Sequence, residues 1–295
     1  MSNVHAPSDD GLPPEIECAV YRALHPDLSQ FGDEALRQHF RLHGRSEGRR
    51  ANTLEGREAF AALVRTDMRS LEIGPFAKPM LSGPNVVHCD VLGQAELRNW
   101  ASRIGLNPAN VPHIAHVLGS DGLDGIPGQF DAVLSSHSIE HQPDLVLHLQ
   151  QIDRKLKEHG GKYFVLVPDK RYCFDHYMAP STIAEIVEAH HQRRTVHTLK
   201  GVIEHRALTT HNDARRHWNG DHGSPTIKPD LVRGAIDEWR AAKGGYVDVH
   251  AWYFTPDSFA ENVTLLNQLG LTRCKVVRIY STRYGAGEFW AVLST

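Results

Sequence analysis

The chain has 295 residues, with 32 Lys and Arg side chains, 35 Asp and Glu side chains and a formal net charge of −3. This near balance argues against a nucleic-acid partner, and a hydrophobic content of 41% excludes a wholly disordered chain. No apolar run approaches the roughly 20 residues that a membrane-spanning helix needs, and the polar first residues contain no apolar signal segment. We therefore expect a cytoplasmic protein without a membrane span.

Cysteine and histidine are the two informative residue types. The four cysteines are widely separated and form no CxxC pair, so the sequence favours neither a disulfide framework nor a thiolate zinc site. Histidine is unusually frequent, with 20 residues, eight of which fall between positions 176 and 222. Their concentration in one segment predicts a polar functional surface there.

The first part of the chain predicts a tail followed by a small helical unit. Residues 1–14 are rich in Pro, Ser, Asp and Gly without periodicity and predict a disordered tail. Residues 15–55 predict a helical module, because apolar residues recur at helical spacing on both sides of a break at Pro26. Gly44 and Gly48 are expected helix ends. A module of this size is too short to bury a core alone, so we expect it to pack on the rest of the protein.

From Met68 onward, strand patterns alternate with helical patterns. The predicted strands are MRSLEIGPF, NVVHCDVL, HIAHVLGSDGL, FDAVLSSHS and GGKYFVLVPD. A His-rich and Arg-rich helical insertion then occupies about 175–245, where it interrupts the alternation. The pattern resumes with a helix that has Thr255 as its expected N-cap and Pro256 in its first turn.

The last 22 residues contain two β-rich runs joined by Gly-Ala-Gly, which predict a terminal hairpin. Strands that alternate with helices form a parallel sheet covered by helices. The sequence therefore predicts an α/β domain over 56–295 with a doubly wound, mostly parallel seven-stranded sheet. It carries the small N-terminal helical module and the helical insertion after strand five.

Three phrases in this order, LEIGPF, FDAVLSSHSIEH and GGKYFVLVPD, followed by the hairpin, resemble class I S-adenosylmethionine-dependent methyltransferases. The resemblance covers most of Met68 to Thr295 and implies a Rossmann-like fold that binds S-adenosylmethionine. Another segment, YRALHPDL with HGRSEGR, resembles a short module of bacterial enzymes of surface-glycan assembly. Together they imply O-methylation of a sugar or surface glycan in polysaccharide biosynthesis. Residues 15–50 are then expected to contact a glycan-assembly partner or a second copy of the chain.

The expected cofactor site lies at the carboxyl ends of the parallel strands, where α/β proteins bind ligands. Gly74 lets the backbone approach the methionine moiety without a Cβ, and Asp90 follows strand one at about the 20-residue spacing of a ribose-binding acid. The absence of GxGxxG argues against a nicotinamide or flavin dehydrogenase. The predicted cofactor-binding residues are Glu72, Gly74, Pro75, Asp90, Asp121, Gly122 and Ser136.

The expected reacting centre is the phrase HSIEH after strand four. In a helix, His137, Glu140 and His141 would share one face, and we predict them as ligands of a divalent metal ion. The Glu-His pair resembles ubiquinone-pathway O-methyltransferases, which implies that such an ion activates the acceptor hydroxyl. Without a metal ion, His137 is the expected general base and the Glu-His pair braces the loop. Asp169 is expected to orient the base, so the predicted catalytic residues are His137, His141 and Asp169.

The insertion predicts the acceptor site. Trp218, flanked by Asp, Asn, Arg and His, suits a sugar ring, since an aromatic ring covers the apolar face of a sugar while polar groups bind its hydroxyls. The predicted acceptor-binding residues are Arg171, His211, Arg215, His217, Trp218, His222 and His250. A second metal site made of His211, Asp213, His217 and His222 is an alternative interpretation of the same segment.

Three other functions stay open. A glycine-poor turn after Gly74 would suit a docking component of a glycan-assembly complex that keeps the fold without its cofactor. HxxEH is also the spacing of certain zinc peptidases, which would make the chain a metal-dependent hydrolase. A small phenolic acceptor in place of a sugar is the third.

Overall fold

The structure, a computed structural model, describes residues 11–295. Most of the predicted disordered tail, residues 1–10, therefore lies outside the described residues, and residues 11–14 have no regular structure. In the part of the chain that the structure describes, no helix is long and apolar enough to cross a membrane.

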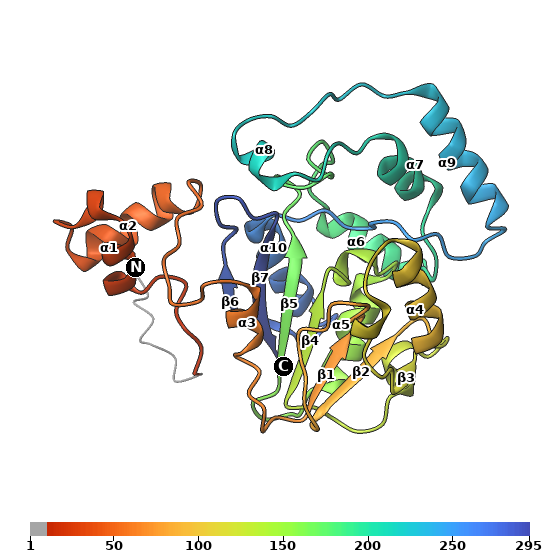
Figure 1. Ribbon diagram of the computed structural model, residues 1–295, viewed down its shortest axis with the longest axis horizontal. Helices are drawn as coiled ribbons and strands as arrows, with labels where there is room; N and C mark the ends of the chain where they lie inside the picture. Colours follow the sequence, from red (N-terminus) through yellow and green to blue (C-terminus); the bar gives the residue numbers. More distant parts are fainter. Residues whose placement is uncertain (1–10) are drawn as a thin grey trace.

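Seven strands form one sheet in the order β3-β2-β1-β4-β5-β7-β6 (Figure 1). The strands are β1 (Ser70–Ile73), β2 (Val86–Asp90), β3 (His116–Val117), β4 (Ala132–Ser136), β5 (Lys162–Pro168), β6 (Lys275–Tyr280) and β7 (Glu288–Ser294). All neighbouring pairs are parallel except those of β7, which runs antiparallel to β5 and β6. This confirms the predicted doubly wound, mostly parallel sheet and its closing hairpin. The predicted third strand is shorter than expected, since only two of its residues pair with β2.

Alternate residues of the strands face two separate cores. On one face, β1, β4, β5 and β7 pack against α5 (Leu145–Lys155), α6 (Ile183–His191) and α10 (Pro256–Gln268). On the other face, β4, β5, β6 and β7 pack against α3 (Arg57–Ala61) and the chain around it. A smaller apolar cluster joins α4 (Gln94–Arg103) to the loop after β1. Short 3-10 helices lie at Pro108–Asn110, Gly122–Gly125 and Ile139–His141.

Helix starts follow the local sequence. Asp144 caps α5, because its Oδ1 accepts a hydrogen bond from the Leu147 backbone N–H at 2.8 Å. Thr255 caps α10 through the Ser258 N–H at 3.2 Å, and Pro256 fills the first turn. The predicted start of the last helix is confirmed.

The N-terminal helices enclose a small core of their own. They are α1 (Cys18–Leu24), a 3-10 turn (Pro26–Leu28), α2 (Asp33–His39) and a π-helical turn (Phe40–Gly44). Figure 1 shows them beside β6. Gly48 joins them to the sheet, since its carbonyl accepts the Tyr284 N–H at 2.9 Å. Gly48 has φ +66°, and an added Cβ would lie 2.3 Å from that nitrogen, so the junction requires glycine.

The predicted insertion is helical but divides into two parts. Its first helix, α6, belongs to the main core through Ile186 and Ala189. The remainder comprises α7 (Leu199–Ala207), α8 (Ala214–Trp218) and α9 (Pro229–Ala241), which lie beyond the carboxyl ends of the parallel strands (Figure 1). Helices α7 and α9 pack on each other around their own apolar cluster. Only this second part borders the edge of the sheet where ligands bind.

A polar chain runs through the main core between the sheet and α5. The Tyr163 hydroxyl lies 2.6 Å from Ser135 Oγ and 3.2 Å from His148 Nε2. Burial lowers the pKa of His148 to about 4, because the charged imidazole would lose its hydration. His148 is therefore neutral in the folded protein at neutral pH.

Phe60 of α3 is fully buried and stacks on Trp290 at a ring distance of 5.3 Å. We expect Phe60→Ala to lower the free energy of unfolding by about 3 to 5 kcal/mol, because it leaves a cavity between α3 and the sheet. Urea denaturation measures this loss. Leu42→Ala is the control, since Leu42 is 63% exposed and its truncation should cost less than about 0.5 kcal/mol. Equal losses would contradict the packing of α3 on the sheet.

Acid should destabilise the fold partly through His148. Its folded pKa lies below the ordinary value of 6.5, so the unfolded chain takes up the proton first as pH falls. This contribution to stability is present above pH 6.5 and is lost between pH 6.5 and about 4. In that range we expect the free energy of unfolding of His148→Gln to change less with pH than that of the wild type. The difference in slope should reach up to about 1.4 kcal/mol per pH unit. Parallel curves from urea titrations of both proteins would contradict a neutral buried His148.

Candidate functional site

Two cavities meet at the carboxyl ends of the parallel strands and share the side chains of His137 and His141. The first has a volume of about 630 Å³ and lies beyond β1, β2 and β4. The second has a volume of about 710 Å³ and lies between the end of β5, the start of β7 and residues 55–57. Both have the volume of ordinary small-molecule sites. Two ligands bound side by side would meet at these two histidines.

The first cavity contains several of the predicted cofactor residues. Gly74 has φ +66°, and no protein atom lies within 4 Å of where its Cβ would be, so its backbone faces open space. Asp90 is 7% exposed at the end of β2, where burial raises the pKa of its carboxyl. Phe76 and Trp100 add an aromatic wall, with their rings 5.1 Å apart. Gly122 also lines this cavity.

Four other predicted cofactor residues have different partners. Buried Glu72 accepts the N–H groups of Met80 and Leu81 at 2.7 and 3.0 Å, so it fixes the loop after β1 behind the cavity. Pro75 is buried between the lining residues Gly74 and Phe76.

The other two lie after β3 and at the end of β4. Asp121 is exposed and accepts from the Ser120 hydroxyl, while Gly119, Ser120 and Gly122 form the cavity wall. Ser136 accepts a hydrogen bond from the Arg57 guanidinium. The side chains of Glu72, Asp121 and Ser136 thus have partners within the protein, and the predicted contacts of these three residues and Pro75 with the cofactor stay predictions.

The carboxylate of Glu140 is the most unusual group at the junction of the cavities. Its side chain is 1% exposed, and neither carboxylate oxygen has a hydrogen-bond partner among the described residues. Its Oε1 lies 3.8 Å from His137 Nδ1, 3.9 Å from His141 Nε2 and 3.9 Å from His250 Nε2. These distances are too long for hydrogen bonds and leave a space bordered by three imidazoles.

Two further carboxylates orient the histidines around Glu140. His141 Nδ1 lies 2.9 Å from Asp248 Oδ1, and His250 Nδ1 lies 2.7 Å from Asp175 Oδ2. Burial opposes protonation of His141, but Asp248 and Glu140 outweigh it and raise its pKa. The same contact lowers the pKa of Asp248 to about 2. Both histidines thus present their Nε2 atoms to Glu140, as metal-ligating histidines held by carboxylates do.

The predicted ligand set of His137, Glu140 and His141 stays a prediction, but these residues do not share one face of an α-helix. His137 is not helical: its φ is +51°, in the left-handed region, and the following turn is a 3-10 helix. Its Nε2 lies 2.5 Å from Glu288 Oε2. One group at this junction whose ligand atoms all lie within 4.8 Å of one another is Glu140, His141 and His250. His137 lies beside it, with Nδ1 3.8 Å from Glu140 Oε1.

His137 has the properties of an oriented base. Its side chain is 43% exposed and lines both cavities. Burial of the ring opposes its charging, but the hydrogen bond to Glu288 and the charge of Glu140 raise the pKa of His137. Because a carboxylate only accepts, Nε2 carries the proton and Nδ1 is left with its lone pair.

Asp169 does not reach the reacting centre. It is fully buried and accepts hydrogen bonds at 2.6 Å from both Arg171 Nη2 and Thr282 Oγ1. Its oxygens join β5 to the loop between β6 and β7, and its predicted catalytic role stays a prediction. Arg171 is held in the same pair and does not line either cavity, and its predicted role in acceptor binding also stays a prediction.

The second cavity is polar and aromatic. Its lining residues include Arg57, Tyr172, Phe174, Asn212, Arg283 and Glu288, with the predicted His250. Trp218 does not line it: the indole stacks on Tyr172 at 3.8 Å and 7°, and its N–H donates to the Ala286 carbonyl. Tyr172 therefore covers one face of the Trp218 indole, and the role of Trp218 as a sugar platform stays a prediction. Arg215 is exposed beside Gly285, outside the lining.

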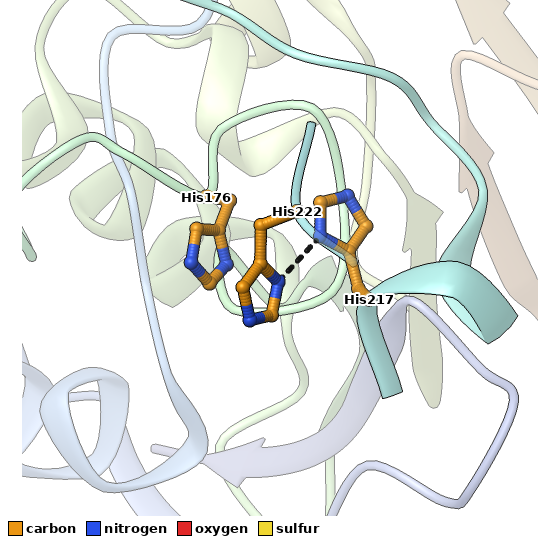
Figure 2. Close-up of side chains that lie close together, drawn as sticks. All are labelled: His176, His217 and His222. Carbon is orange, nitrogen blue, oxygen red and sulfur yellow. Dashed lines mark hydrogen bonds between the residues drawn. The ribbon is translucent and has the colours of Figure 1, made fainter. Parts of the chain in front are cut away.

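The three remaining predicted acceptor residues, His211, His217 and His222, also lie outside both cavities. They gather with His176, which follows β5. Figure 2 shows His176, His217 and His222. Burial lowers the pKa of His217 and of His176, and the neighbouring imidazoles lower both further. The histidine-rich segment thus forms a separate cluster instead of an acceptor surface.

Sequence reasoning missed Arg57, Asp175, Asp248 and Glu288. Arg57 Nε lies 3.0 Å from Glu288 Oε1, so both frame the second cavity beside His137. Of these four residues, only Glu288 could have been found from a sequence pattern, because it follows the glycine turn and begins an expected strand.

No known protein-family profile matches the chain, and no curated protein matches it in sequence. Among solved structures, the chain is similar to the CcbJ methyltransferase from Streptomyces caelestis, with 12% identity, 85% of this chain and 94% of that chain covered, and a TM-score of 0.41. A S-adenosylmethionine-dependent methyltransferase from Clostridium acetobutylicum gives 9% identity, coverage of 88% and 98%, and a TM-score of 0.39. The DhpI complex with SAH gives 15% identity, coverage of 94% of this chain and 94% of that chain, and a TM-score of 0.36. Similarity at this level identifies neither a cofactor nor an acceptor for this chain.

Proposed function

We propose that the protein is an S-adenosylmethionine-dependent O-methyltransferase that methylates a hydroxyl of a sugar or glycan with the help of a divalent metal ion. The observation that carries this proposal is the meeting of two cavities at His137 and His141, beside the unpartnered buried carboxylate of Glu140. A transfer between two bound molecules needs such a junction.

The first cavity fits the cofactor. S-adenosylmethionine supplies an electrophilic methyl group on a sulfonium sulfur. Asp90 is placed to accept hydrogen bonds from the ribose hydroxyls, and the open backbone at Gly74 leaves room for the methionine moiety. Phe76 and Trp100 offer flat surfaces for the adenine ring.

Glu140, His141 and His250 fit a divalent ion. A buried carboxylate is costly unless it is hydrogen-bonded, paired with a charge or bound to a cation, and Glu140 has no hydrogen-bond partner among residues 11–295. One carboxylate and two imidazoles suit a divalent transition metal. An ion held there would lower the pKa of a bound hydroxyl. Asp175 and Asp248 keep the two imidazoles directed toward the ion position.

His137 takes the proton in this scheme. As the acceptor oxygen forms its bond to the methyl carbon, the carbon–sulfur bond breaks and the hydroxyl proton passes to His137 Nδ1. Glu288 holds the opposite ring nitrogen and stabilises the imidazolium that results. The walls of the second cavity support a polyhydroxylated acceptor, since guanidinium, amide and carboxylate groups there alternate with aromatic rings.

The cofactor site is tested by calorimetric titration with S-adenosylhomocysteine. We expect Asp90→Ala to weaken binding by about tenfold or more, because charge-assisted hydrogen bonds to the ribose are lost. Asp121→Ala is the matched control, an acid after the neighbouring strand whose side chain lies outside the cavity, and it should bind as the wild type does. Absence of binding by the wild type would overturn the enzyme proposal and favour the docking function.

The metal centre is tested by metal content and by radiolabelled methyl transfer to a panel of sugar nucleotides and oligosaccharides. We expect Glu140→Gln to lose one bound ion and the activity while it still binds S-adenosylhomocysteine. His137→Gln should keep that ion but lower kcat, by about 100-fold or more, because it removes the base. Full activity in a strong chelator would show that His137 works without a metal ion.

A further inference from the structure

Three histidines outside the reacting centre converge between two segments of the fold. His176 follows β5, His217 lies in α8, and His222 lies in the turn after α8. One ring nitrogen of each lies within 4.8 Å of the other two. Figure 2 shows the three rings side by side, with His217 Nδ1 and His222 Nδ1 3.1 Å apart.

Backbone carbonyls fix the tautomers of two of these rings. His176 Nδ1 lies 2.8 Å from the Arg171 carbonyl, and His217 Nε2 lies 3.0 Å from the His211 carbonyl. A carbonyl only accepts, so these nitrogens carry the protons. The lone pairs are therefore at His176 Nε2 and His217 Nδ1. A histidine that donates its other N–H to a backbone carbonyl is the usual state of a metal ligand.

We propose that His176, His217 and His222 bind one divalent transition-metal ion of the zinc class, at a site separate from Glu140. Two imidazole nitrogens on one tetrahedral zinc ion lie about 3.3 Å apart, given zinc–nitrogen bonds of about 2.05 Å. The 3.1 Å between His217 and His222 is close to that separation. Because the three ligands are imidazoles, the site favours Zn²⁺, Ni²⁺ or Cu²⁺ over Mg²⁺ or Ca²⁺.

The site has three protein ligands, because the neighbouring His211 is not available as a fourth. His211 is fully engaged, since Nε2 meets the Asp221 carbonyl and Nδ1 accepts the Asp213 N–H. A water molecule would complete a tetrahedron. The rings of His176 and His222 are stacked at 3.7 Å and 9°. Because ring lone pairs lie in the ring plane, binding tilts these two rings away from parallel.

The ion would link the chain after β5 to α8 and its following turn. Tyr172 and Phe174 on one side and Asn212 and Ala214 on the other line the acceptor cavity. The site would therefore fix two walls of this cavity relative to each other. An ion that binds only the folded state stabilises it in proportion to the logarithm of the free ion concentration.

The test is a Zn²⁺ titration of tag-free, chelator-stripped protein against a chromophoric competitor, in a Glu140→Gln background that disables the other centre. We expect one equivalent to bind, and His222→Ala or His176→Gln to weaken its affinity by at least about tenfold. His159→Ala is the matched control, because His159 is exposed and remote in sequence, and it should leave the affinity unchanged.

Co²⁺ gives a second readout, as visible absorption bands that should appear at one equivalent and disappear in His222→Ala. Thermal unfolding without metal checks that each variant is folded, and two independent substitutions guard against the failure of one. No zinc binding in the Glu140→Gln background, or equal binding after both histidine substitutions, would overturn the proposed site. Either result leaves the cofactor and Glu140 assignments unaffected, since those are tested on other residues.

Discussion

The buried carboxylate of Glu140 is the constraint on which the arrangement of the site depends. Taking a charged carboxylate out of water costs several kcal/mol unless other charges or a bound cation compensate. Here three imidazoles surround it at 3.8 to 3.9 Å, without a direct hydrogen bond. The fold keeps this charge in place because the Glu140 carbonyl accepts the Ala251 N–H at 2.7 Å, which anchors the turn to the returning chain.

The insertion supplies the groups that orient this centre. Asp175 comes from the segment after β5, while Asp248 and His250 come from the chain that returns from α9 toward α10. Glu288 at the start of β7 holds His137 from the other side. The turn after β4 thus carries His137, Glu140 and His141, and the groups that orient them come from the chain between β5 and α10 and from β7. The second cavity, which we propose holds the acceptor, forms where these segments meet.

The sheet could be predicted because its strands are apolar runs separated by clear helix and turn signals. The number of strands, the mostly parallel sheet with its closing hairpin and the cap at Thr255 followed from those local patterns. The third strand was overestimated, since pairing with β2 ends after two residues. At the strand ends, Gly74 and Asp90 line the first cavity because the ends of β1 and β2 carry them there, and their contact with the cofactor stays a prediction.

The details of the reacting centre depended on contacts distant in sequence. HSIEH was expected to be helical, but left-handed backbone at His137 turns its ring toward Glu288, more than one hundred residues away. The path of the chain after α9 brings His250 beside Glu140 as well. The polar residues that flank Trp218 in the sequence are typical of a sugar-binding surface, but Tyr172 covers one face of its ring. No local pattern encodes these pairings, because they arise from how the insertion packs.

The most direct measurement is a crystal structure of the protein grown with S-adenosylhomocysteine and Mn²⁺ or Zn²⁺, with anomalous data collected for the metal. The account predicts S-adenosylhomocysteine in the cavity of Gly74 and Asp90, with its sulfur toward His137, and an anomalous peak among Glu140, His141 and His250. S-adenosylhomocysteine bound elsewhere, or a Glu140 carboxylate neutralised by a protein side chain with no metal peak beside it, would contradict the proposed metal-assisted methyl transfer.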